Sequence, residues 1–147
     1  MNRALDDLIQ AFRFRTLPKA EWTHEAHLRV GAWHVYHYGP DEALEQLRRG
    51  ITGLNERHGT VNSPTSGYHE TITRAYVLLL DEFLRVFEVE TPLDARVNAI
   101  VSSPMASKAM LHRFWSDGLL MSPRARAGWV PPDVAPLSLH RALAPPN

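Results

Sequence analysis

Two histidines lie three positions apart in the segment EWTHEAHLRV, residues 21–30. Side chains at positions i and i+3 of an α-helix are neighbours on its surface, so both imidazoles would face one ion if this segment is helical. Thr23 precedes the pair and belongs to the residue types that favour a helix N-cap. The spacing therefore predicts that His24 and His27 share one face at the start of a helix.

A third histidine, His69, lies in the segment GYHETITR, residues 67–74, where a long apolar stretch begins. In a helical bundle, ligands of a metal site come from facing helices. Three imidazoles and a water form the ligand set of an open catalytic site, in which the ion activates the water. We therefore predict a divalent metal bound by His24, His27 and His69.

The predicted metal is zinc, iron, manganese or nickel, because imidazole and carboxylate ligands accept all four. Glu70, beside His69, is the expected general base, and Glu25 takes that role if its side chain points inward. His69 itself is a further candidate for acid–base catalysis because imidazole titrates near neutral pH. The leading hypothesis is thus a small enzyme in which the metal activates water or polarises a small-molecule substrate.

Three side chains near His69 form the predicted substrate-binding set: Tyr68, Arg74 and Tyr76. An arginine binds a carboxylate or phosphate through two parallel hydrogen bonds, which suits Arg74 for an anionic substrate. The simpler interpretation of Arg74 is an ion pair with Glu70, four residues earlier on the same helix.

Two other functions fit the same residues. One is a non-catalytic ligand-binding or interaction module, in which the aromatic side chains Trp33 and Tyr36 form the seam of a homodimer. The other is metal-free acid–base catalysis by His69 and Glu70. A nucleophilic serine is not favoured, because the chain lacks the G-x-S-x-G pattern.

The elements that carry these residues are predicted to be helices. Apolar residues recur at helical spacing in residues 5–12, from Thr23 to the break at Gly39, and from Pro40 to about Arg57. The segment 68–89 reads as the central and most buried helix, and shorter helices are expected in 91–103 and 103–116. No segment shows the alternation of a strand.

The chain of 147 residues is expected to form a single domain, residues 1–147. We predict an all-α bundle of about four main helices with additional short ones. Residues 118–147 are rich in proline and are expected to form an irregular tail that wraps the bundle, anchored by Trp129 and Leu137.

The amino-acid composition limits the partners, the chemistry and the location that we expect for this protein. Sixteen basic residues balance sixteen acidic ones, which argues against nucleic acid as a partner. The chain has no cysteine, so thiolate chemistry and disulfides are excluded. It has neither a signal-peptide pattern nor a membrane-spanning segment, and we expect a cytoplasmic protein that does not bind membranes.

The motifs WTHEAHL and GYHETITR, with the later segment FWSDGLLMSPRARAGWVPPDVAPL, resemble a family of small uncharacterised bacterial all-helical proteins. The resemblance covers residues 22–137 and supports the choice of His24, His27 and His69. The arrangement of histidines on bundle helices also resembles the DinB-like metal-binding bundles, whose members include thiol-dependent transferases. That second resemblance is architectural, since the HxxH spacing differs from the DinB pattern, and it implies a divalent metal.

Overall fold

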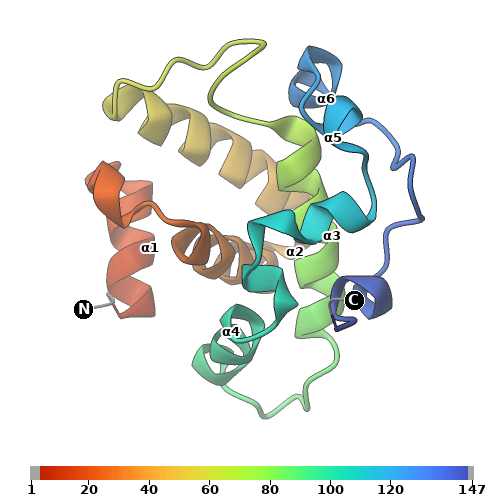
Figure 1. Ribbon diagram of the computed structural model, residues 1–147. Helices are drawn as coiled ribbons and strands as arrows, with labels where there is room; N and C mark the ends of the chain where they lie inside the picture. Colours follow the sequence, from red (N-terminus) through yellow and green to blue (C-terminus); the bar gives the residue numbers. More distant parts are fainter. Residues whose placement is uncertain (1–3, 146–147) are drawn as a thin grey trace.

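The computed structural model describes residues 4–145 as an assembly of helices without a strand (Figure 1). The helices in chain order are α1 (Leu5–Arg13), η1 (Lys19–Glu21), α2 (His24–Arg57), α3 (Glu70–Leu84), α4 (Leu93–Val101), η2 (Pro104–Ala106), η3 (Lys108–Arg113), α5 (Asp117–Leu120), α6 (Pro123–Ala127) and α7 (Leu139–Ala142). The predicted all-α class is confirmed. No helix within residues 4–145 combines the length and the apolar character needed to cross a bilayer.

Helix α2 consists of two limbs that meet at Gly39. This glycine has φ 77° and ψ 168°, which is not helical and is readily adopted only without a Cβ, and Pro40 begins the second limb. At the start of the first limb, Thr23 Oγ1 accepts a hydrogen bond of 3.2 Å from Ala26 N. Both the N-cap and the break were predicted, and both are confirmed. Figure 1 shows the two limbs running at an angle to each other beside α3.

Helix α3 is the central helix, as predicted, and one face of it is fully buried against α2. It ends at Leu84, earlier than the predicted segment 68–89. The guanidinium group of the buried Arg96 donates hydrogen bonds to backbone carbonyls after this point, including Leu84 O at 2.9 Å and Val89 O at 3.0 Å. The bond to Leu84 O satisfies one carbonyl that the helix leaves unpaired at its C-terminus, and the bonds to Glu88 O and Val89 O hold the segment that follows.

The segment 103–116 does not form the single helix that its apolar spacing predicted. It forms the two 3₁₀ segments η2 and η3, because the hydroxyls of Ser103 and Ser107 accept hydrogen bonds from Met105 N and Ala109 N. The inward-facing residues were predicted correctly, since four apolar side chains are buried: Met110, Leu111, Phe114 and Trp115. This segment places η2 against the start of α2, where Met105 O contacts His24.

The proline-rich tail packs along the outer side of α3, with the short helices α5, α6 and α7 in it (Figure 1). Thr71 Oγ1 donates a hydrogen bond to Gly128 O at 2.8 Å and accepts one from Val130 N at 3.1 Å. The predicted anchors Trp129 and Leu137 are partly buried against the core. The tail therefore covers one side of α3.

Candidate functional site

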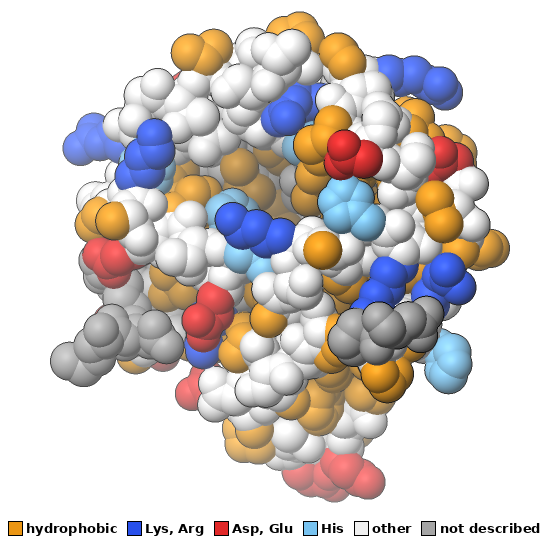
Figure 2. All heavy atoms as spheres, in the orientation of Figure 1, with side chains coloured by type: hydrophobic (Ala, Val, Ile, Leu, Met, Phe, Trp, Pro, Cys, Tyr) orange, Lys and Arg blue, Asp and Glu red, His pale blue; other side chains and the backbone are white. Residues whose placement is uncertain are grey.

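A hollow of about 430 Å³ lies between both limbs of α2, the face of α3 that carries Ile72, Tyr76 and Leu80, and the segment from η3 to Met121. Its walls are largely apolar and include Leu28, Ile51, Ile72, Val77, Leu80 and Leu111. Figure 2 shows this hollow near the middle of one face, with hydrophobic side chains inside it and histidine and basic side chains at its edge. The volume is within the range of roughly 300–1,000 Å³ that small-molecule sites occupy.

His27 lines the hollow as a neutral imidazole. Its Nδ1 donates a hydrogen bond of 2.7 Å to Thr23 O, and its ring stacks on Trp22 with a centroid distance of 3.7 Å. The ring keeps accessible surface toward the hollow, but desolvation by the surrounding protein lowers its pKa to about 4. At neutral pH, Nε2 therefore carries a lone pair that accepts a hydrogen bond or binds a metal ion.

His24 also lines the hollow, and a distant carbonyl fixes its orientation. Its Nε2 donates a hydrogen bond of 3.0 Å to Met105 O, which lies 81 residues later in η2. In the neutral ring this leaves Nδ1 unprotonated, and Nδ1 has no hydrogen bond to the described part of the chain. The predicted pairing of His24 and His27 on one helix face is therefore observed in the hollow.

Tyr76 is the member of the predicted substrate-binding set that reaches the hollow. Its ring contacts His24 edge-to-face with a centroid distance of 5.5 Å. Burial raises the pKa of the phenol above its usual range, so Oη keeps its proton. Within residues 4–145 Oη has no hydrogen-bond partner, which leaves it free to donate to a ligand.

Sequence reasoning missed two side chains at the rim, Lys108 and His112. Both lie in η3 and line the hollow. His112 Nδ1 is 3.9 Å from Asp117 Oδ1, whereas Lys108 has no ion pair with any residue from 4 to 145. The sequence does contain a signal for this pair, since a lysine and a histidine lie four positions apart in a largely apolar segment.

His69 does not join the other two histidines. Its Nδ1 accepts a hydrogen bond from Ile72 N at 3.1 Å, which caps α3, and its Nε2 donates one of 2.6 Å to Leu120 O. Both ring nitrogens are occupied, and the ring is buried behind the wall of the hollow. The expected convergence of His24, His27 and His69 on one ion is therefore not the geometry of this chain.

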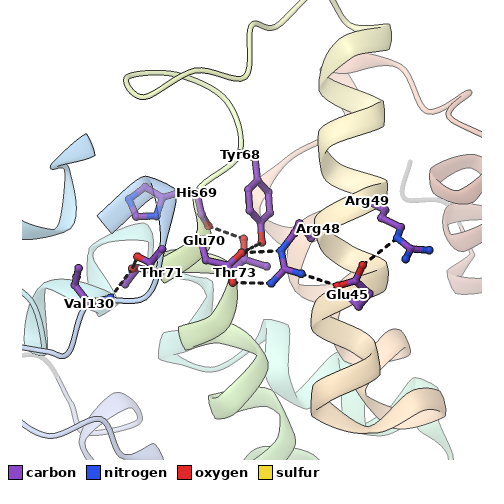
Figure 3. Close-up of polar contacts among 10 residues, drawn as sticks. Glu45, Arg48, Arg49, Tyr68, His69, Glu70, Thr71, Thr73 and Val130 are labelled. Carbon is purple, nitrogen blue, oxygen red and sulfur yellow. Dashed lines mark hydrogen bonds and ion pairs between the residues drawn. The ribbon is translucent and has the colours of Figure 1, made fainter. Parts of the chain in front are cut away.

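Glu70 is held outside the hollow by an ion pair (Figure 3). Arg48 donates Nε–H to Oε1 at 3.0 Å and Nη2–H to Oε2 at 2.8 Å, and the Tyr68 hydroxyl donates to Oε1 at 2.7 Å. Desolvation favours the neutral acid, but these hydrogen bonds outweigh it and lower the pKa of Glu70. Figure 3 shows the ring of His69 on a different side of the start of α3.

This arrangement corrects two predicted roles. Glu70 is an ionised link between α2 and α3 whose oxygens are all engaged, so it is not placed to act as the base of the hollow. Tyr68 donates its hydroxyl proton to that carboxylate rather than to a substrate. Because neither His69 nor Glu70 lines the hollow, the metal-free pairing of these two residues loses its geometric basis.

Two further predicted residues lie elsewhere. The carboxylate of Glu25 accepts hydrogen bonds from Arg29 at 2.8 and 3.2 Å and does not line the hollow. The guanidinium of Arg74 lies over the ring of Trp129, 4.8 Å from its centroid. Arg74 therefore attaches the tail to α3; it does not line the hollow, and Glu70 pairs with Arg48 instead.

Within residues 4–145, no group of three His, Asp or Glu side chains is arranged to hold a metal ion. His24 and His27 line the hollow with one ring nitrogen each held by a backbone carbonyl and the other without a hydrogen bond to the described residues, and His112 lines it as a third imidazole. Comparison with known protein families, curated proteins and solved structures finds no match to this chain.

Proposed function

We propose that the hollow binds a small, largely apolar molecule whose polar end contacts His24 and His27. The observation that carries this proposal is the pair of imidazoles: each is held by a backbone carbonyl and keeps one free nitrogen beside an apolar cavity. A few oriented polar groups in an apolar concavity are typical of small-molecule sites. Tyr76 adds a hydrogen-bond donor to the two acceptors.

Binding is favoured over base catalysis by His27. A general base is most effective when its pKa lies near the working pH, and the pKa of His27 is lowered to about 4. The ring is also held in place by Trp22 and Thr23, which suits a fixed hydrogen-bond acceptor. We therefore assign His27 a positioning role toward the ligand.

The test is a titration of the protein with 2-naphthol, an uncharged aromatic probe, followed by tryptophan fluorescence and by NMR. We expect saturable binding to the wild type and its loss in Ile51→Trp, since Ile51 lines the hollow and a larger side chain fills it. Leu44→Trp is the matched control, because Leu44 is also partly buried but does not line the hollow. Binding that survives Ile51→Trp would overturn the proposal.

A divalent metal held by His24 and His27 is the second candidate function, and one observation favours it. Metal-binding histidines usually donate their other ring nitrogen to a carbonyl or carboxylate, as both residues do here. Two protein ligands leave coordination positions for water and substrate, so the site would polarise a substrate or activate water.

Elemental analysis after dialysis against zinc or manganese tests this second candidate. Near-stoichiometric metal is expected in the wild type and is lost in His24→Ala and His27→Ala. His140→Ala serves as the control, because His140 is exposed and remote from the hollow. Equal metal content in all four proteins would exclude the two-histidine site.

A further inference from the structure

The hollow is lined by one lysine and, among the described residues, by no carboxylate. Its lining contains Lys108 and three histidines, and no Asp or Glu of the described residues is part of it. Asp117, the acid beside His112, has a side chain that is 81% exposed and does not line the hollow. An anionic group that enters the hollow therefore meets no opposing carboxylate on its walls.

Lys108 differs from several other cations of the chain, which are paired with carboxylates. Arg29, Arg48 and Arg85 each form an ion pair with a carboxylate on a helix. Lys108 has no such partner within residues 4–145, and its charge is close enough to His27 to lower the pKa of that ring further. The ammonium group of Lys108 therefore lies close to the His27 ring at the hollow.

The hydrogen-bonding groups divide into donors and acceptors. Lys108 Nζ and Tyr76 Oη are donors, whereas His27 Nε2, and His24 Nδ1 in the neutral ring, are acceptors. A carboxylate alone would satisfy the donors and leave the acceptors facing its negative charge. A ligand with both a carboxylate and a hydroxyl group satisfies both sets.

We infer that the hollow selects an apolar hydroxy acid, whose carboxylate pairs with Lys108 and Tyr76 and whose hydroxyl donates to His27 or His24. The apolar body of the ligand lies against Leu28, Ile72 and the other aliphatic walls. This inference rests on the proposed small-molecule function and adds the class of ligand to it.

The probes for this inference share one ring system: 3-hydroxy-1-naphthoate, whose hydroxyl is too far from the carboxylate for an internal hydrogen bond, 1-naphthoate and 2-naphthol. We expect the hydroxy acid to bind the wild type about two- to fivefold more tightly than 2-naphthol, the range for an ion pair at a solvent-exposed rim. It should also bind more tightly than 1-naphthoate. Raising the salt concentration should reduce the advantage over 2-naphthol, because the pair at Lys108 is screened.

Lys108→Met is the decisive variant, and Lys19→Met is its control. These are the two lysines of the chain; each begins a 3₁₀ segment and is exposed, but only Lys108 lines the hollow. In Lys108→Met the hydroxy acid should lose most of its advantage over 2-naphthol, because only the contact of the carboxylate with Tyr76 remains, whereas Lys19→Met should behave as the wild type. An unchanged preference in Lys108→Met, or no preference for the acid in the wild type, overturns the inference.

The outcomes separate the two proposals. If 2-naphthol binds and is lost in Ile51→Trp while the carboxylate has no advantage, the hollow remains a ligand site and the hydroxy-acid assignment fails. If none of the three probes binds the wild type, both proposals fail together.

Discussion

His69 Nε2 donates a hydrogen bond of 2.6 Å to the carbonyl of Leu120, 51 residues later in the chain. The same ring caps α3 through Nδ1, so one imidazole connects the start of the central helix to the segment that carries the far wall of the hollow. His69 therefore has a structural role, and we expect its replacement to lower the free energy of unfolding.

His69→Ala is expected to lower the free energy of unfolding by about 2 kcal/mol, through loss of the cap and of the partner of a buried carbonyl. Urea denaturation measures the change. His69→Asn retains a side-chain oxygen that accepts from Ile72 N and should recover part of the loss. Equal stability of the alanine variant and the wild type would contradict the capping role.

The stability of the fold should fall as the pH drops below about 6.5. Desolvation lowers the pKa values of His69 and His34 from the ordinary 6.5, so the unfolded chain binds more protons than the folded one below that pH. The pKa of Glu70 is lowered from 4.5, so its contribution is lost only at more acidic pH.

Unfolding free energies at pH 7.5 and pH 5.5 test this linkage. We expect the unfolding free energy of His69→Asn to differ less between the two pH values than that of the wild type, because the variant has one titrating imidazole fewer. A wild-type protein that is equally stable at both values would show that these rings are not held neutral.

The link between Arg48 and Glu70 should affect stability and leave the hollow unchanged. Glu70→Gln keeps the shape of the side chain but removes the charge that Arg48 pairs with. Because the Arg48 side chain is 40% exposed, we expect a loss of only about 1 kcal/mol. Affinity for 2-naphthol should change by less than about twofold. A strong loss of binding at unchanged stability would instead place Glu70 in the ligand site.

The turn before α3 depends on Gly67, which has φ 79°. A Cβ at this position would lie 2.5 Å from Asn62 Oδ1 and 2.7 Å from Val61 O. Gly67→Ala is expected to cost about 1–3 kcal/mol, measured by thermal and urea unfolding. Gly118→Ala is the control, because a Cβ there meets no atom within 4 Å; a similar loss in both variants would argue against local strain.

Much of the helical architecture could be predicted because its signals are local. Thr23 caps a helix through an amide three residues away, and Gly39 breaks one through its own φ angle. The segment 103–116 was predicted less well, although its buried residues were identified. Its apolar spacing is compatible with both α and 3₁₀ geometry, and the serine hydroxyls decide between them.

The candidate site could be predicted only in part. The spacing of His24 and His27 determined by itself that two imidazoles lie on one helix face, since that follows from helix geometry. Met105 O determines which ring nitrogen of His24 is free, and Leu120 O occupies the Nε2 of His69. Those carbonyls are distant in the chain, so only tertiary packing brings them to the rings and brings Lys108 to the rim of the hollow.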